Sequence, residues 1–138
     1  MKEVTHQSLR KFNLIMGGFH LIQGVLMLFL IPAVIENIAQ FQPTIIQYFL
    51  DFDETTQSLF SNQQDLFDLP FAVFVAMFLL LSALAHAIIS LPKKTNDIYN
   101  RDLENGVNRF RWFEYALSSS IMIVLIATLF GVYDLATL

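Results

Sequence analysis

The sequence predicts an all-α membrane protein with three transmembrane helices and a long connection between the first two. Three apolar stretches predict these helices, because a helix rising 1.5 Å per residue needs about 20 residues to cross a bilayer core. Of the 138 residues, 55% are apolar and only 14% are charged, and the mean hydropathy is +0.54. So few charges are unusual for a soluble domain. We therefore expect a single membrane domain over residues 1–138.

The first predicted helix, residues 11–34, is apolar around its whole circumference. It has no charge between Phe12 and Val34, whereas a helix in a soluble core keeps a polar outer face. Its few small or polar residues follow steps of four, three and four, which places them on one helix face. They are Asn13, Gly17, His20 and Gly24. The two glycines predict close packing against another helix.

The connection over residues 35–68 contains acidic side chains and no basic ones. Within it, Thr44 to Leu50 is β-rich, Asp53 to Thr56 is turn-prone, and Ser58 to Phe60 follows. This order predicts a small β-hairpin on the outer membrane surface. An amphipathic interfacial helix is the alternative.

The second predicted helix, residues 69–91, is bounded by two prolines and contains no charge. Pro70 suits a first helical turn, and Pro92 suits a position just after a helix end. Ser82 and His86 are four residues apart, so they share one face.

The third predicted helix, residues 110–134, has a single charged residue, Glu114, between Trp112 and Tyr133. Ser118 and Met122 continue the face of Glu114 at steps of four, and Tyr115 lies beside it. Each predicted helix therefore presents one polar stripe.

All eight basic residues precede the first apolar stretch, which starts at Phe12, or lie between the second apolar stretch and Trp112 in the third, where a loop over residues 92–109 is predicted. Short basic loops stay in the cytoplasm, so the N terminus is expected inside and residues 35–68 outside a cell membrane that the chain crosses several times. The basic residues are Lys2, Arg10, Lys11, Lys93, Lys94, Arg101, Arg109 and Arg111.

Several classes of function are excluded by composition. The chain has no cysteine, so it forms no disulfide or thiolate site, and its net charge of −4 gives no reason to expect nucleic acid as a partner. It has no nucleophile–base pair, phosphate loop or close-spaced metal-ligand pair, so we expect neither an enzyme nor a metal site.

Three ionisable side chains lie in the half of the predicted helices nearer the basic end. At 1.5 Å per residue from the basic end, His20 is about 14 Å deep, and His86 and Glu114 are each about 8 Å deep. They could form a hydrogen-bonded network, hold a proton or neutralise a buried cation. Alternatively, Glu114 reaches toward the surface and pairs with Arg111 or Arg109, and each histidine only links neighbouring helices.

The third helix resembles that of the heliorhodopsins, whose signature is R-W-x-E-Y-[SA]-L-S-[SA]-S. The matching stretch here runs from Arg111 to Ser120 and reads RWFEYALSSS. Phe12-Asn13 with the segment Phe19 to Gln23 is similar to the first helix of that family, and Leu81 to His86 is similar to its second helix.

The resemblance implies the first three helices of a seven-helix, retinal-binding, light-sensing bundle with inverted topology, usually a homodimer and without strong ion pumping. Glu114 falls where the family keeps the counterion of the retinal Schiff base. Other matches fall in the polar network around that counterion, namely His20, Gln23, Ser82, His86, Asn108 and Tyr115. Trp112, Ser118 and Met122 fall along the retinal side of the third helix.

One departure concerns the retinal lysine, which the family keeps in its seventh helix. The four lysines here are expected outside the transmembrane helices, so this chain has no Schiff-base lysine. We expect an N-terminal portion of a longer or split protein, completed by further C-terminal helices, or a natural truncation. A small membrane scaffold, regulatory protein or proton relay that oligomerises in the bilayer is the alternative.

Overall fold

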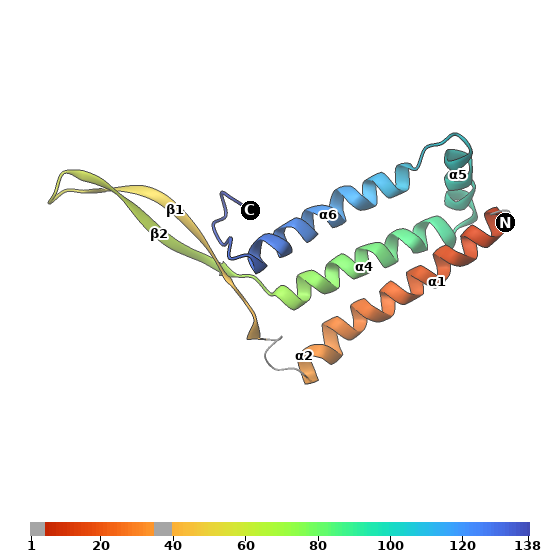
Figure 1. Ribbon diagram of the computed structural model, residues 1–138, viewed down its shortest axis with the longest axis horizontal. Helices are drawn as coiled ribbons and strands as arrows, with labels where there is room; N and C mark the ends of the chain where they lie inside the picture. The colour runs from red at the N-terminus through yellow and green to blue at the C-terminus, as the bar shows by residue number, and fades with distance from the viewer. Residues whose placement is uncertain (1–4, 35–39) are drawn as a thin grey trace.

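The computed structural model describes residues 5–34 and 40–138 and is mostly helical (Figure 1). As predicted, three of its helices are long and apolar enough to cross a membrane, and a two-stranded hairpin lies between the first two. Lys2 and Glu36, part of the predicted charge pattern, lie outside the described residues. The elements are α1 (His6–Val25), a π-helix (Leu26–Leu30), α2 (Ile31–Val34), β1 (Thr44–Asp53), β2 (Ser58–Asp68), α4 (Phe71–Ser90), α5 (Lys93–Glu104) and α6 (Arg109–Leu129).

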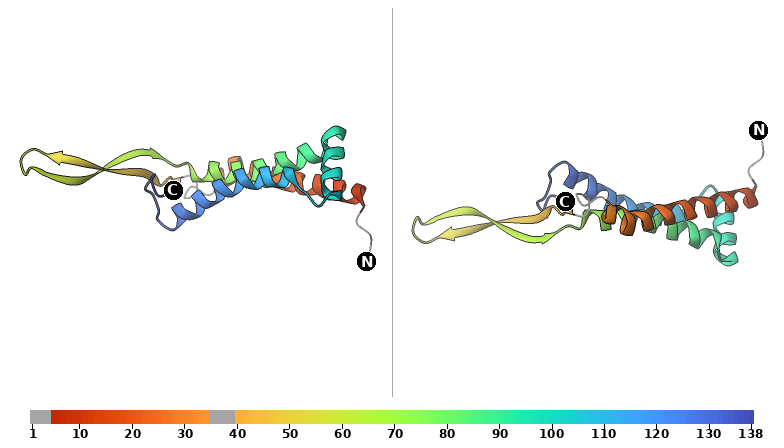
Figure 2. Two further views of the ribbon diagram at one scale, coloured as in Figure 1. Left: turned by 90° about the horizontal axis from the view of Figure 1, so that it is seen from above. Right: turned by 90° about the horizontal axis from the view of Figure 1, so that it is seen from below.

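The helix α4 lies between α1 and α6 (Figure 1). The start of α1 and the short helix α5 lie at one end of the molecule, whereas the hairpin and the C terminus lie at the other (Figure 2). The described basic residues are all on the first turns of α1, on α5 or on the first turn of α6. The charge separation read from the sequence is thus a separation in space, and the cytoplasmic position of the N terminus stays a prediction.

Helix α1 begins at His6, five residues before the predicted start, because a capping box forms ahead of the apolar stretch. Ser8 N–H donates to Thr5 Oγ1 at 3.2 Å, and Thr5 N–H donates to Ser8 Oγ at 3.1 Å, which satisfies two donors that a helix start leaves free. The expectation that every lysine lies outside the helices is therefore wrong for Lys11, which is exposed on α1.

The C-terminal end of α4 has all of its last carbonyls hydrogen-bonded. Arg10 of α1 donates from Nε at 2.7 Å and from Nη2 at 3.2 Å, while Thr95 Oγ1 and Asn96 Nδ2 of α5 donate to two further carbonyls. Such carbonyls have no partner within their own helix. The acceptors are Ile88, Ile89, Ser90 and Leu91.

The predicted loop over residues 92–109 is wrong for most of its length, because residues 93–104 form the helix α5. Its buried residues Asn96, Tyr99 and Asp102 recur every three positions and so share one face. Two of them are polar, so the buried face is not the apolar stripe by which a helix is usually recognised in a sequence. Arg109 holds the end of α5 to the start of α6 through two hydrogen bonds to Asp102, at 2.7 and 2.9 Å.

Helix α6 ends at Leu129, five residues before the predicted end. Gly131 adopts a φ of +85°, its N–H donates to Thr128 O, and Val132 N–H donates to Ala127 O. This pair of bonds is a Schellman cap, which glycine at this position favours. The chain then turns beside β1, where Ile46 N–H donates to Tyr133 O at 2.9 Å and Leu135 N–H donates to Ile46 O at 2.8 Å.

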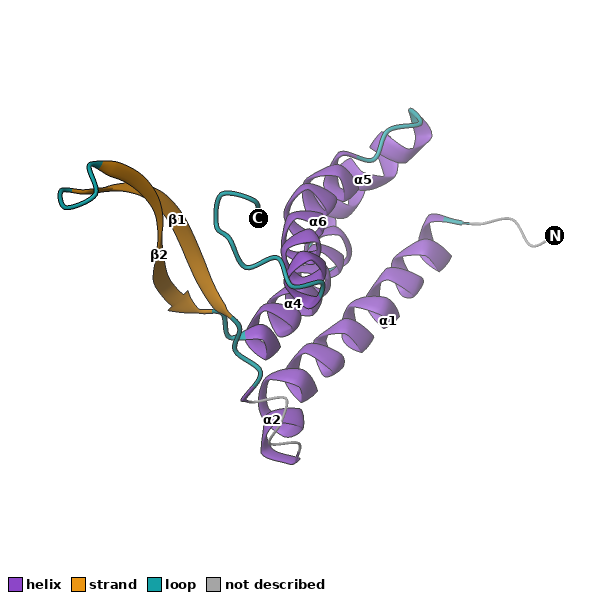
Figure 3. Ribbon diagram, turned by 60° about the vertical axis from the view of Figure 1, so that its left-hand side comes forward, coloured by secondary structure: helices purple, strands orange, loops and turns teal. Residues whose placement is uncertain are grey.

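The predicted hairpin is confirmed, and the alternative of an interfacial helix is wrong. Strands β1 and β2 pair antiparallel from Thr44 opposite Asp68 to Asp53 opposite Ser58. Asp53 accepts hydrogen bonds from the backbone of Thr55 and from the hydroxyl of Thr56, which hold the turn and lower the pKa of Asp53. The hairpin projects away from the helix ends (Figure 3).

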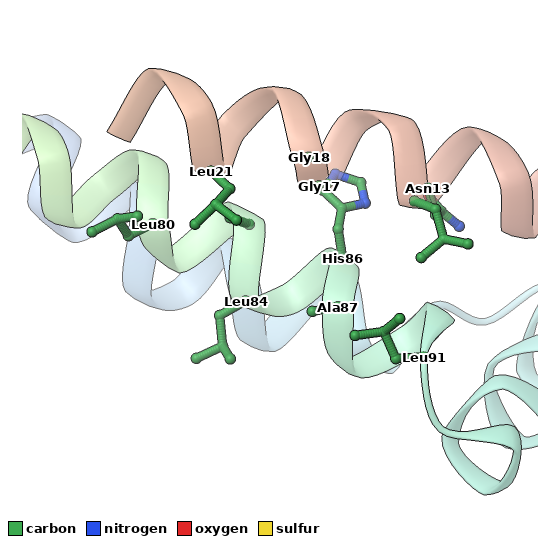
Figure 4. Close-up of a pocket in the computed structure, with 11 residues that line it drawn as sticks. Asn13, Gly17, Gly18, Leu21, Leu80, Leu84, His86, Ala87 and Leu91 are labelled. Carbon is green, nitrogen blue, oxygen red and sulfur yellow. The ribbon is translucent and has the colours of Figure 1, made fainter. Parts of the chain in front are cut away.

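Glycines allow α1 to approach α4 closely. A Cβ added at Gly17 would lie 2.9 Å from the Cβ of His86, and one added at Gly24 would lie 2.8 Å from the side chain of Leu80. Figure 4 shows the His86 ring reaching from α4 toward α1 beside Gly17. Both glycines are therefore close-packing positions, as the sequence predicts.

The close contact at Gly17 predicts a sharp difference between two neighbouring substitutions. Gly17→Ala pushes a methyl group against the His86 Cβ, which cannot rotate away, so it should destabilise the helix pair by about 1–3 kcal/mol. Gly18→Ala is the control, because nothing lies within 4 Å of its added Cβ. Unfolding in micelles measures both variants, and equal stability of the two would contradict the packing described here.

The ion pair between Asp102 and Arg109 predicts a pH-dependent contribution to stability. The Arg109 hydrogen bonds lower the pKa of Asp102 below its ordinary value of 3.8, so the pair stabilises the fold above that pH and is lost as the pH falls through the lowered value. Asp102→Asn should thus melt at a lower temperature than the parent chain at pH 7. The difference should shrink as the pH falls below about 4, and a constant difference would argue against the pair.

Candidate functional site

A cavity of about 430 Å³ lies on the basic half of the three spanning helices. Helix α4 forms its floor, and α1 and α6 form its walls. Its lining combines polar groups with aromatic rings and methionines. The lining residues are Phe12, Met16, His20, Phe78, Ser82, His86, Arg111, Glu114, Tyr115, Ser118, Ser119 and Met122.

The carboxylate of Glu114 lies at the basic end of this cavity and is held from two sides. Ser82 Oγ of α4 donates to Glu114 Oε1 at 2.8 Å, and Arg111 Nη1 lies 3.5 Å from Glu114 Oε2. The Glu114 side chain is only 8% exposed, so it does not reach to the surface. The predicted alternative of an arginine partner is right for Arg111, whereas Arg109 pairs with Asp102 instead.

The two intramembrane histidines stack against each other across the α1–α4 contact. Their ring centroids are 5.8 Å apart and their planes are inclined by 13°. The Nδ1 atom of each is buried and has no hydrogen-bond partner among the described residues. Buried polar atoms of this kind usually have a partner, so His20 and His86 have capacity for a further ligand or water.

A second, smaller cavity of about 180 Å³ continues from Glu114 toward α5. It shares His86, Arg111 and Glu114 with the larger cavity and adds Asn108 and Tyr99. Asn108 is the N-cap of α6, and its Oδ1 accepts from Arg111 N–H at 3.1 Å. Asn108 therefore lies on the α5 side of Glu114 and does not line the larger cavity.

Seven of the ten predicted site residues meet at the larger cavity, and three do not: Asn108, Trp112 and Gln23. Trp112 is 61% exposed, and neither it nor Gln23 is part of the cavity lining. Two residues along a helix turn the side chain through about 200°, so Trp112 lies on the face of α6 opposite Glu114. The predicted residues that do line the cavity are His20, Ser82, His86, Glu114, Tyr115, Ser118 and Met122.

Two apolar residues of the lining, Met16 and Phe78, were not predicted from the sequence. Met16 precedes His20 by four residues, and Phe78 precedes Ser82 by four. Helical spacing therefore places both on the stripes that were predicted from polar residues alone. Arg111 was expected only as a partner of Glu114, yet its guanidinium carbon also lies 4.4 Å from the centre of the Tyr115 ring.

The fold and the site define a class: a membrane protein that crosses the bilayer several times and encloses a carboxylate and two histidines around a cavity between its helices. Ionisable residues in such positions usually serve function. A model of the heliorhodopsin family matches residues 9–138, and the chain belongs to that family. Heliorhodopsins are light-sensing proteins of the rhodopsin type. A comparison with curated protein sequences finds no match.

Full-length heliorhodopsins bind retinal, and the larger cavity has the features of one wall of such a site. Glu114 offers a negative charge at one end, and Met16, Phe78 and Met122 offer apolar contacts along the cavity. The unpartnered histidine atoms add hydrogen-bonding capacity. No lysine lines the cavity among the described residues, so the lining fits the charged and apolar surroundings of retinal and not its covalent attachment.

The hydrogen bond from Ser82 to Glu114 predicts that the stability of the chain depends on the Ser82 hydroxyl. Ser82→Ala leaves one oxygen of a buried carboxylate without its donor, which should destabilise the chain by about 1–3 kcal/mol. Ser120→Ala is the matched control, because Ser120 is exposed and its hydroxyl bonds only to Ala116 O of its own turn. Unfolding of both variants in micelles tests this, and a neutral Ser82→Ala would show that the bond contributes little.

Proposed function

We propose that this chain supplies the counterion and the surrounding polar network of a light-sensing retinal protein that signals and does not pump ions. The observation that carries the proposal is the buried Glu114 carboxylate at the end of a cavity between all three helices. Retinal bound through a protonated Schiff base supplies a positive, light-absorbing group. Neutralising that charge is the role we assign to Glu114.

Glu114 has capacity for a further partner. A carboxylate accepts about four hydrogen bonds, and Glu114 has one short bond from Ser82 and a longer contact of 3.5 Å to Arg111. The side chain of Arg111 is 43% exposed, so solvent weakens its hold on the carboxylate. A desolvated cation within the cavity would therefore bind Glu114 more strongly than Arg111 does.

The distribution of charge supports sensing over pumping. Proton pumps place ionisable residues along a path through the membrane. In the described parts of the three spanning helices, no Asp, Glu, His, Lys or Arg follows His20 in α1, precedes His86 in α4 or follows Glu114 in α6. The half of these helices toward the hairpin thus offers no acidic, basic or histidine side chain for a relay.

We further propose that a lysine on a helix from a C-terminal continuation or a second chain completes the pocket. We also propose that two copies associate through their exposed apolar faces in the bilayer. Leu117 and Ile123 are among the α6 side chains that do not line the larger cavity and are more than half exposed. Lipid or another helix would cover such a face.

A second candidate function, a proton relay without retinal, is favoured by one observation. The stacked histidines each keep a free Nδ1 atom near a carboxylate, and an imidazole can take up and release a proton near neutral pH. The two candidates differ in whether the chain takes part in binding retinal, which the following experiment measures.

The retinal experiment uses the whole chain in membranes with all-trans retinal, alone and together with a second chain that carries the lysine-bearing helix of a heliorhodopsin. We expect a visible absorption band when both chains are present, because the counterion and the lysine come together only then. A band from the second chain alone, or no band in any combination, contradicts the proposal and favours the relay.

Glu114→Gln tests the counterion role within that experiment. The amide removes the negative partner of the chromophore, so the absorption maximum should shift relative to the parent chain. Glu104→Gln is the matched control, because Glu104 is exposed on α5 and pairs with His6 far from the cavity. Equal spectra for the parent chain and Glu114→Gln would exclude Glu114 as the counterion.

A further inference from the structure

A cavity of about 380 Å³ lies outside the candidate retinal site, in the angle between α5 and α6. Its lining differs from that of the other cavities, because it combines two arginines with two half-buried apolar side chains, Ile98 and Phe110, and one exposed ring, Phe113. The lining residues are Ile98, Arg101, Asp102, Arg109, Phe110 and Phe113.

The arginines give this cavity a net positive charge and free donors. Asp102 is buried and uses both carboxylate oxygens on Arg109, which fixes the Arg109 guanidinium in place. A guanidinium has five N–H groups, so Arg109 keeps donors for another acceptor. The guanidinium of Arg101 has no hydrogen bond or ion pair within the described ranges and lies exposed at the cavity.

Two of the three apolar lining residues belong to the spanning helix α6, and the third, Ile98, belongs to α5. Phe110 and Phe113 lie on the first turns of α6, where its membrane-spanning segment begins, and Phe113 is 73% exposed. The cavity therefore lies where phosphate groups of the bilayer meet the beginning of its hydrocarbon. A ligand for it needs a negative head and an apolar tail in one molecule.

We propose that this cavity binds an anionic phospholipid, with its phosphate on Arg101 and Arg109 and an acyl chain along Ile98 and Phe113. Charge complementarity selects the headgroup, because basic pockets beside spanning helices bind anionic lipid heads. Arginine matches phosphate through paired N–H groups. The site is independent of the proposed retinal function, since none of its residues lines the larger cavity.

The test is native mass spectrometry of the whole chain extracted from vesicles of equal parts phosphatidylglycerol and phosphatidylcholine. We expect phosphatidylglycerol to be retained preferentially. Arg101→Gln should lower that retention about fivefold, the effect of removing roughly one interfacial charge. Lys94→Gln is the matched control, since it removes one exposed charge from the same helix outside the cavity, and it should change retention less than about twofold.

Phe113→Ser tests the apolar half of the site, since it removes the exposed ring and keeps both arginines. Retention of phosphatidylglycerol should fall while the helical content stays that of the parent chain. Excess glycerol phosphate should not displace the lipid, because it has no acyl chain.

Four results would overturn the proposal. One is equal retention of the two lipids, and another is equal behaviour of Arg101→Gln and Lys94→Gln. Displacement by glycerol phosphate would indicate a site for free phosphate instead. Because the chain has no cysteine, Phe113→Cys can form a disulfide dimer only through position 113. Such a dimer in vesicles, with lower phosphatidylglycerol retention than the reduced Phe113→Cys chain, would assign the cavity to a second copy of the chain.

Discussion

Hydrocarbon offers no hydrogen bonds, so each polar group that a spanning helix carries into the bilayer needs a partner within the protein. The end of α4 shows how this constraint orders the rest of the chain. Pro92 stops the helix, and the carbonyls left free are bonded by Arg10 of α1 and by Thr95 and Asn96 of α5. These bonds fix the start of α1 and the direction of α5 against one helix end.

The same constraint acts on side chains deeper in the helices. Gly17 lets α1 approach α4 closely enough for His20 and His86 to stack, and Ser82 supplies the donor that Glu114 needs. Because α4 lies between α1 and α6, these groups face one shared cavity. Close packing of the helices and hydrogen bonds to buried polar groups therefore form the site together. The chain belongs to the heliorhodopsin family, and full-length members of that family bind retinal.

The sequence predicted the three spanning helices, the hairpin and the polar stripe on each helix, since hydropathy and side-chain periodicity are local properties. It missed α5, whose buried face depends on Asn96 and Asp102 finding partners in other segments. It also grouped Trp112 with the cavity, although helical rotation alone places that side chain opposite Glu114. The ends of α1 and α6 differed because capping at Thr5 and Gly131, and not hydropathy, sets them.

By itself, the sequence determined which segments are apolar enough to span a membrane, which end carries the basic charge and which polar residues share a helix face. Only the tertiary structure decided that Glu114 is held by Ser82 and Arg111, that Arg109 belongs to Asp102, and that the two histidines stack. The physical reason is that these pairings depend on the rotation and spacing of neighbouring helices. Those quantities are set by contacts such as Gly17 against His86, between residues far apart in the chain.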